Sequence, residues 1–293
     1  MRARPILVGG AAAVIAAGAM QLFAPLSETG SISLPSDSEF ARGKAAFASL
    51  LSAPQEALAD ADLSGLAGLG FEPGAIDGVQ DALLIREGAD TCAGRGVYWL
   101  RSGEKPGSNL AITAPHRGSD RHTGTLAAAL FAETSARAAG WNSAPRRASA
   151  ACPNALDITR EKGHLFSAFA LGFAQAVPDG LFVQLHGFDR ERRDTLAARE
   201  AGMILSNGTG EPDARLYDLA DCLSIAFAPT PVLVYPGDTP ELGALSNAQG
   251  QLLREAGFGG FVHIEISADL RAAMVEEVDL RARLGACLVE GAA

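Results

Sequence analysis

The chain has 293 residues, a formal net charge of −10 and 48% hydrophobic residues. This is enough apolar material for one large globular core, or at most for two small ones. The acidic balance argues against a nucleic-acid partner, because proteins that bind a phosphate backbone need a basic face. We therefore expect no nucleic acid among its partners.

The first residues have the layout of an export signal. A basic start at Arg2 and Arg4 precedes a short apolar run over 6–19, and the Ala-Gly-Ala sequence that ends the run fits a small-residue cleavage site. The run is short for a membrane span. Residues 1–24 are therefore predicted to be a signal peptide or an uncleaved N-terminal anchor, and such an anchor is the only membrane contact that we expect.

An export signal predicts that the rest of the protein works in the periplasm or is secreted. Residues 25–37 are small and polar and are predicted to be a linker, whereas 38–293 is predicted to be a single domain. The cysteines are widely spaced and contain no C-x-x-C pair, so we interpret them as structural and expect one or two disulfides. They are Cys92, Cys152, Cys222 and Cys287, and the sequence leaves their pairing open.

Short apolar runs alternate with longer helical patterns along the predicted domain. An apolar stripe predicts a helix over 38–59, and the stretch 60–80, rich in Gly, Asp and Ala, has only weak signals. The predicted strands are 82–88, 96–103, 109–116, 181–188, 202–208, 231–237 and 260–267. The other predicted helices are 124–138, 158–176, 213–227, 247–256 and 268–286. This alternation predicts an α/β fold with a central mixed, mostly parallel sheet and helices on both faces.

Polar side chains gather at or near the ends of three predicted strands. His116 follows one strand, with Asp120 four residues later, and His186 lies near the end of another. Glu265 lies in a third strand, on the same face as His263, where a buried acid needs a partner. Ligands of open α/β sheets bind beyond the carboxyl ends of the strands, so these clusters predict one common site.

Two histidines and one carboxylate form a ligand set for catalytic zinc, which keeps a fourth position for water and lowers the pKa of that water. His116, Asp120 and His186 match the ligands of a single zinc ion, and Glu265 matches a general base. His122 could replace Asp120 as a ligand, although we expect it to lie beside the site. Any one of these histidines, taken singly, is more often a surface or core residue than a ligand. The prediction therefore depends on their shared placement.

Three motifs together resemble the zinc carboxypeptidase clan: APHRGSD, VQLHGF and HIEIS, the last followed by Leu270-Arg271. The closest-looking branches are the N-formylglutamate amidohydrolase-like and poly-γ-glutamate hydrolase-like enzymes, and the resemblance spans roughly 82–271. It implies one zinc ion and hydrolysis of an amide bond near a carboxylate. A small peptide or N-acyl amino acid would be the substrate.

Carried over to this sequence, the resemblance assigns roles to six residues. The ligands would be His116, Asp120 and His186, the catalytic base would be Glu265, and Arg146 or Arg147 would bind the substrate carboxylate or the oxyanion. The commonest ligand spacing in the clan is H-x-x-E, whereas Ser119 occupies that position here. The departure supports an alternative, a catalytically inactive exported binding protein on the same fold. No G-x-S-x-G motif supports a serine hydrolase.

Two further residues near the predicted site have structural interpretations. Asp157 is predicted to cap the helix that follows it, and a role in supporting a metal ligand is a second interpretation. His164 is predicted to be a surface or core histidine on that helix or in its lead-in.

Overall fold

The computed structural model describes residues 34–54, 57–58, 61–88, 93–102, 107–147, 152 and 155–293. The predicted export segment, most of the predicted linker and Cys92 lie outside these ranges. Within the described ranges, none of the helices combines the length and the apolar character needed to cross a bilayer.

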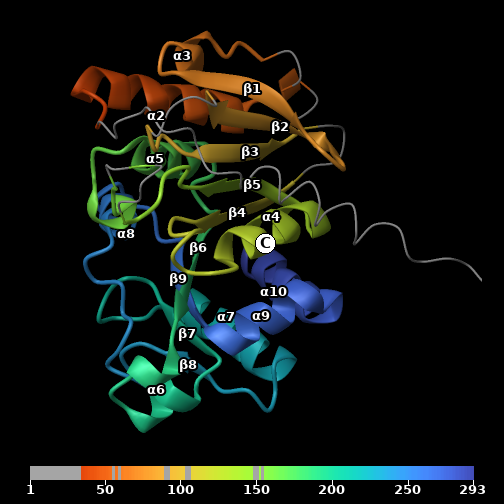
Figure 1. Cartoon of the computed structure of the whole chain (residues 1–293), viewed down its shortest axis with the longest axis vertical. Helices are drawn as coiled ribbons and strands as arrows, with labels where there is room; N and C mark the ends of the chain where they lie inside the picture. The colour runs from red at the N-terminus through yellow and green to blue at the C-terminus, as the bar shows by residue number, and fades with distance from the viewer. Residues whose placement is uncertain are drawn as a thin grey trace, which may run out of the picture.

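A nine-stranded mixed sheet forms the centre of the fold, which is the α/β class that the sequence predicts (Figure 1). Its strands are β1 (Phe71–Ile76), β2 (Val79–Glu87), β3 (Val97–Arg101), β4 (Ser108–Ala114), β5 (Ala136–Trp141), β6 (Leu181–Phe188), β7 (Met203–Ser206), β8 (Val232–Val234) and β9 (Phe261–Ser267). They are ordered β1-β2-β3-β5-β4-β6-β9-β7-β8. The adjacent strands β5, β4, β6 and β9 run parallel to one another, and the pairs that flank this block, β3–β5 and β7–β9, are antiparallel. The parallel arrangement is thus concentrated at the centre of the sheet.

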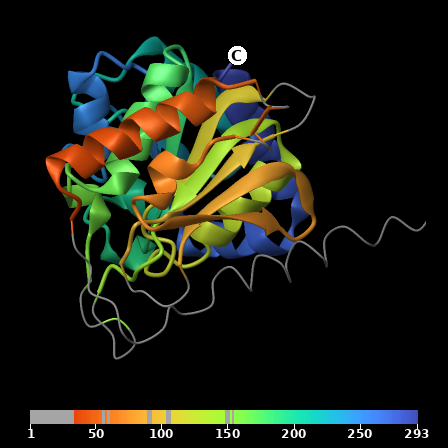
Figure 2. The same cartoon turned by 90° about the horizontal axis from the view of Figure 1, so that it is seen from above.

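Helices cover both faces of this sheet (Figures 1 and 2). One face packs against α2 (Asp37–Ser52), α3 (Ser64–Ala67), α5 (Leu165–Ala176) and α8 (Ala248–Glu255). The other packs against α4 (Thr123–Glu133), α7 (Ala214–Ala226), α9 (Ala268–Glu276) and α10 (Val278–Gly291). The short helix α6 (Leu196–Glu200) and the 3₁₀ turns η2 (Ile158–Arg160) and η3 (Arg190–Arg192) lie in the connections. Each face has its own apolar core.

The largest difference from the predicted elements is in the second predicted helix. The helix predicted over 124–138 ends at Glu133, and its last residues begin β5, a strand that the sequence does not signal. The strand is rich in alanine, which favours helix locally. It lies between β3 and β4, where large side chains would not fit: a Cβ at Gly140 would lie 3.0 Å from the ring of Tyr98. Tertiary packing therefore overrides the local preference.

Other boundaries shift for local reasons. The helix predicted over 158–176 is divided into η2 and α5, with His164 as the N-cap of α5. The helix predicted over 268–286 is broken at Glu277, which ends α9 and precedes α10. The weakly patterned stretch 60–80 contains α3 and β1.

The alternation of side chains along β6 and β9 determines where the site lies. On the α4 side, both strands stay apolar along their whole length: Val183 and Leu185 in β6, and Val262, Ile264 and Ile266 in β9. On the α5 side, the cross-strand pairs change from apolar to polar toward the carboxyl ends. From the amino end, these pairs are Phe182–Phe261, Gln184–His263 and His186–Glu265.

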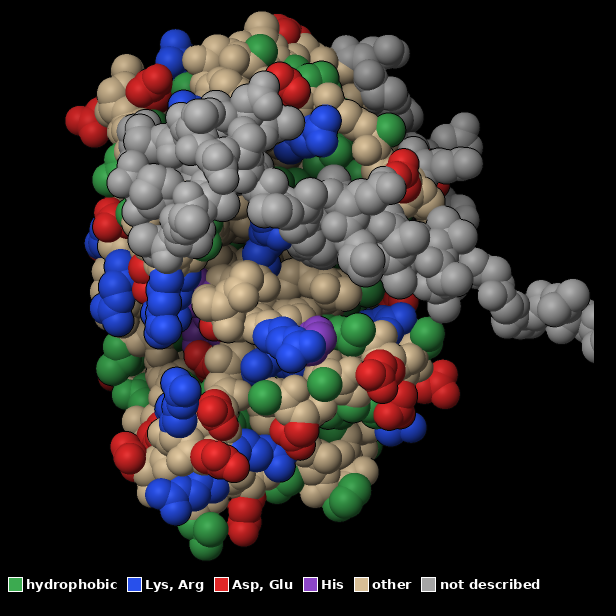
Figure 3. Space-filling view, in the orientation of Figure 1, with side chains coloured by type: hydrophobic (Ala, Val, Ile, Leu, Met, Phe, Trp, Pro, Cys, Tyr) green, Lys and Arg blue, Asp and Glu red, His purple; other side chains and the backbone are tan. Residues whose placement is uncertain are grey.

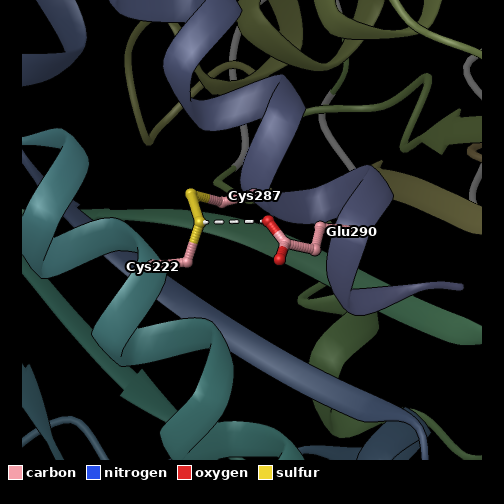
Figure 4. Close-up of a disulfide and its surroundings, with 3 residues drawn as sticks. All are labelled: Cys222, Cys287 and Glu290. Carbon is pink, nitrogen blue, oxygen red and sulfur yellow. Dashed lines mark hydrogen bonds between the residues drawn. A yellow bond between two sulfur atoms is a disulfide. The ribbon is translucent and has the colours of Figure 1, made fainter.

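A disulfide links two of the helices on the α4 side, α7 and α10. Cys222 of α7 is bonded to Cys287 of α10, and Oε2 of Glu290 lies 3.8 Å from Sγ of Cys222 (Figure 4). Cys152 is also disulfide-bonded. Disulfides persist mainly in oxidising compartments, which is consistent with the predicted export.

Candidate metal centre

A single turn after β4 places His116 and Asp120 side by side. The backbone N–H of Asp120 donates to the carbonyl of His116 over 2.8 Å, which is the bond of one helical turn. Residues four apart on such a turn face the same way. As a result, Oδ2 of Asp120 lies 3.4 Å from Nδ1 of His116. The four-residue spacing that departs from H-x-x-E therefore suits the turn that this sequence forms.

Asp157 fixes the ring of His116 from the opposite side. Nε2 of His116 donates to Oδ1 of Asp157 over 2.7 Å, and Asp157 also caps η2 by accepting the N–H of Thr159. Arg146 holds the other oxygen of Asp157 through Nε at 2.9 Å and Nη2 at 2.8 Å. The predicted capping role of Asp157 is confirmed, and its hydrogen bond to His116 is the contact that a supporting role would need. Because the proton of a neutral imidazole is then on Nε2, the lone pair of His116 Nδ1 is left for a ligand.

The second histidine is oriented in the same way by amides. His186 Nε2 donates to Oε1 of Gln184 over 3.3 Å, and the same oxygen accepts from Asn247 over 2.7 Å. Gln184 in turn donates to Gln249 over 3.2 Å. Nδ1 of His186 faces Oδ2 of Asp120 at 3.4 Å. Both histidines thus present Nδ1 to one carboxylate oxygen.

The charges around this carboxylate suit a cation. Burial raises the pKa of Asp120, but His116 and His186 outweigh it and hold that pKa far below its usual range, so the group is ionised. Burial lowers the pKa of His186, which keeps its ring neutral. Burial also acts to lower the pKa of His116, yet the carboxylates of Asp120 and Asp157 raise it overall. A cation between the rings would replace the proton that these carboxylates otherwise attract.

The spacing of the three donor atoms fits a tetrahedral metal ion. Ligand atoms about 2.1 Å from a tetrahedral zinc lie about 3.4 Å from one another. The two Nδ1–Oδ2 distances are both 3.4 Å. Nδ1 of His116 is buried and has no hydrogen-bond partner among the described residues, as expected for an atom placed to bind an ion. His116, Asp120 and His186 therefore fit the metal that the sequence implies.

Glu265 lies beside His186 in the sheet and has a different environment from Asp120. Its Oε1 is 3.6 Å from Nε2 of His263, and its buried Oε2 has no hydrogen-bond partner among the described residues. Burial, followed by the repulsion of Asp120, raises the pKa of Glu265 to about 8. A carboxyl group with this pKa is suited to taking up and releasing a proton near neutral pH.

Glu265 also belongs to a second group of potential ligands. One ligand atom from each of His186, His263 and Glu265 lies within 4.8 Å of the others. The ring of His263 lies 4.3 Å from that of His186, between centroids. Asp120 is ionised in the metal-free protein, which makes its group the better candidate to hold an ion, whereas Glu265 exchanges its proton near neutral pH and suits proton transfer.

Both groups lie in a cleft of about 900 Å³ at the carboxyl ends of the central strands. Of the residues that the structure describes, six arginines line it: Arg146, Arg147, Arg160, Arg192, Arg193 and Arg271. Figure 3 shows Lys and Arg side chains gathered at the left of the molecule, with histidine recessed behind them. The cleft is therefore cationic in a protein of net charge −10.

The structure brings together the four residues that the sequence places at the centre of the site: His116, Asp120, His186 and Glu265. The two predicted substrate arginines border the same cleft, with Arg146 bound to Asp157 and Arg147 exposed. His122 is the N-cap of α4 and belongs to neither group of potential ligands.

Sequence reasoning missed the contact of Gln184 with His186. It placed His263 on the same face as Glu265 but gave this histidine no role, and the structure brings Nε2 of His263 to 3.6 Å from Oε1 of Glu265. Their signal is the period of two along each strand, because Gln184 is two residues before His186, and His263 is two residues before Glu265.

No protein-family model and no curated protein matches the chain. Solved structures are similar to parts of it. A metallo-carboxypeptidase from Burkholderia cenocepacia aligns with a TM-score of 0.39 and 10% identity, over 67% of this chain and 60% of that one. A gene product of Agrobacterium tumefaciens aligns with a TM-score of 0.35 and 15% identity, over 62% of this chain and 91% of that one. A candidate metallopeptidase from Shewanella amazonensis aligns with a TM-score of 0.36 and 13% identity, over 84% of this chain and 90% of that one. Likeness at this level carries no argument about activity, so the function is inferred from the site itself.

Proposed function

We propose that this protein is a zinc-dependent hydrolase of amide bonds. The observation that carries the proposal is the convergence of His116, Asp120 and His186, with one ligand atom from each within 4.8 Å of the others. Glu265 is paired with His186 across β6 and β9, and this position beside the proposed ligands supports a role as proton acceptor. A single zinc ion is proposed because its tetrahedral preference fits the 3.4 Å spacing.

The bound ion would act as a Lewis acid that makes water nucleophilic near neutral pH. Glu265 would accept a proton from the attacking water on Oε2, which has no hydrogen-bond partner among the described residues, while His263 lies against Oε1. The buried surroundings that raise its pKa to about 8 let the carboxyl group keep the proton until the leaving amine takes it. Asp157 and Gln184 keep both histidine rings in the orientation and tautomer that ligation requires.

The arginines of the cleft support a substrate that carries a carboxylate. A guanidinium group binds a carboxylate through two parallel hydrogen bonds, and Arg146 and Arg147 border the site where such a group would lie. Cations concentrated in a cleft attract an anion despite a negative overall charge. We propose small peptides, glutamyl compounds or N-acyl amino acids as substrates, cleaved next to the carboxylate.

We infer the compartment in which the protein works from its N-terminal segment and its cysteines. Residues 1–24 have the pattern of an export segment, and Cys222 and Cys287 form a disulfide. Both favour the periplasm or the extracellular space.

The test is a hydrolysis assay of zinc-loaded protein on peptide, glutamyl and N-acyl amino acid substrates. We expect Glu265→Gln to lower kcat by about 10²–10⁴-fold, because it removes the general base, and to leave the zinc content unchanged. The matched control is Glu211→Gln, which makes the same chemical change at an exposed position. Equal activity in wild type and Glu265→Gln would contradict the proposal, and bound substrate without turnover would instead indicate a binding protein.

A further inference from the structure

One guanidinium group joins the three segments that carry the site. Arg271, in the first turn of α9, donates from Nε to the carbonyl of Arg121 over 2.8 Å. Its Nη1 donates to the carbonyl of Ile266 and, over 3.4 Å, to that of Phe188. These three carbonyls belong to the turn after β4, the end of β9 and the end of β6.

Each of these carbonyls is close in sequence to a residue of the site. Arg121 directly follows Asp120, Ile266 directly follows Glu265, and Phe188 is two residues after His186. The ends of β6 and β9 are paired with each other in the sheet, with His186 opposite Glu265 and Gly187 opposite Ile266. The turn after β4 lies beyond the last β4–β6 pair, Thr113–Gln184, so its place relative to these two ends depends on packing and on hydrogen bonds that cross to it.

The local sequence makes room for this arrangement. Arg271 is only 6% exposed, and a Cβ at position 187 would overlap its guanidinium group. Glycine at 187 lets the guanidinium lie against the backbone of β6. The N–H of Gly187 also donates to Oδ2 of Asp120 over 3.3 Å, which adds a direct link between β6 and the turn after β4.

The planar fork of arginine is needed for these contacts. Three carbonyls in different directions can be bonded by a group with five fixed N–H donors, whereas a lysine ammonium at the end of a flexible chain holds no such geometry. Arg271 also borders the cleft, so its charge lies on the same side as Asp120 and Glu265.

A second buried arginine offers a direct comparison. Arg281 is 7% exposed and donates to the carboxylate of Glu133 and to the carbonyls of Met274 and Val275. It joins α4, α9 and α10 on the α4 side of the sheet, and it is not among the described residues that line the cleft. The two arginines thus have similar burial and similar numbers of partners but connect different parts of the fold.

We propose that Arg271 is a positioning residue that holds the turn carrying Asp120 against the paired ends of β6 and β9, which carry His186 and Glu265. This role rests on the proposed metal site for its functional meaning, but the arrangement of the segments can be measured in the metal-free protein.

The first test is amide hydrogen exchange of the metal-free protein, followed by mass spectrometry, for Arg271→Lys and Arg281→Lys. We expect Arg271→Lys to speed exchange by about 10-fold or more over 116–124, 186–190 and 265–270 together, because local opening there becomes easier. Arg281→Lys should speed exchange only around Glu133 and at the junction of α9 and α10. Exchange in Arg271→Lys that changes in α9 alone would overturn the proposal.

The second test measures zinc affinity by competition with a chromophoric chelator. Residues that orient metal ligands typically change affinity by about 10–100-fold, so we expect a loss of this size in Arg271→Lys and none in Arg281→Lys. Gly187→Ala, which displaces the guanidinium while keeping the arginine, should reproduce both results if Arg271→Lys fails to fold. Wild-type affinity in a folded Arg271→Lys would overturn the proposal. A wild-type protein that binds no zinc would contradict the proposed function, and the exchange experiment would still decide the positioning role.

Discussion

The two faces of the sheet use the same strands for different purposes. On the α4 side, Val262, Ile264 and Ile266 keep β9 apolar to its carboxyl end, and the core there is continuous. On the α5 side, Phe261 packs in the core, but the next residues on that face are His263 and Glu265. One face therefore contributes only packing, whereas the other contributes packing at the amino ends of the strands and chemistry at the carboxyl ends.

The comparison explains how a stable sheet can hold buried polar groups. Burial of apolar surface on the α4 side and around Phe182 and Phe261 stabilises the strands. Three buried atoms have no hydrogen-bond partner within the described part of the chain: Nδ1 of His116, Nδ1 of His263 and Oε2 of Glu265. The stability of the strands allows them to be held in place at a cost in free energy. The separation of roles between faces can be tested residue by residue.

The largest effect on stability is expected from the apolar face. Ile264→Ala removes a side chain with no exposed surface and should lower the free energy of unfolding by about 2–5 kcal/mol. Urea unfolding would measure this loss. The folded variant should keep wild-type zinc affinity, because the side chain points away from the site. A large loss of zinc affinity before any unfolding would break the division between the two faces.

The next effect concerns a buried histidine outside the site. His164 accepts the N–H of Phe166 on Nδ1 and donates from Nε2 to the carbonyl of Gly94, so both nitrogens are used within the protein. Burial lowers its pKa from 6.5 to about 4. Between these two pH values the unfolded chain binds a proton that the folded chain does not, so stability falls as the pH falls.

The expected loss from this histidine between pH 7 and pH 4 is about 3 kcal/mol. His164→Asn should keep the helix cap and remove this part of the pH dependence, as measured by urea unfolding at both pH values. The same acid sensitivity in wild type and variant would show that His164 is not its source. A matching loss of zinc affinity in His164→Asn would contradict the structural role of this residue.

The smallest of these effects is expected at Asp157, which contacts a proposed ligand without binding the ion. Asp157→Asn keeps the shape and the helix cap but weakens the acceptor for His116 Nε2. Zinc affinity should fall by about 10–100-fold, with little change in the free energy of unfolding. A chelator competition assay would measure it, and unchanged affinity would show that Asp157 only holds η2 and Arg146.

Much of the sheet could be predicted because β6 and β9 alternate with a period of two between turn residues. The range 181–188 matches β6, and 260–267 differs from β9 by one residue. The meeting of His116, His186 and Glu265 followed from the rule that ligands bind beyond the carboxyl ends of parallel strands. In contrast, the alanines of β5 favour helix locally, and only the neighbours β3 and β4 make them a strand.

Contacts between distant segments could not be read from local pattern. Asp157 is 41 residues from His116 and comes from a connection, so its proximity depends on the path of the chain. The partners of Arg271 are three carbonyls, which carry no side-chain signature in the sequence. The pairing of Cys222 with Cys287 likewise required the packing of α7 on α10.

The most direct test of the account is the zinc bound by purified protein, measured by elemental analysis and chelator competition in wild type, His186→Ala and His122→Ala. The account predicts one zinc per wild-type chain, a loss of affinity above about 100-fold in His186→Ala, and wild-type affinity in His122→Ala, which removes a neighbouring histidine outside the site. Equal zinc binding by wild type and His186→Ala, or none by the wild type, would contradict it.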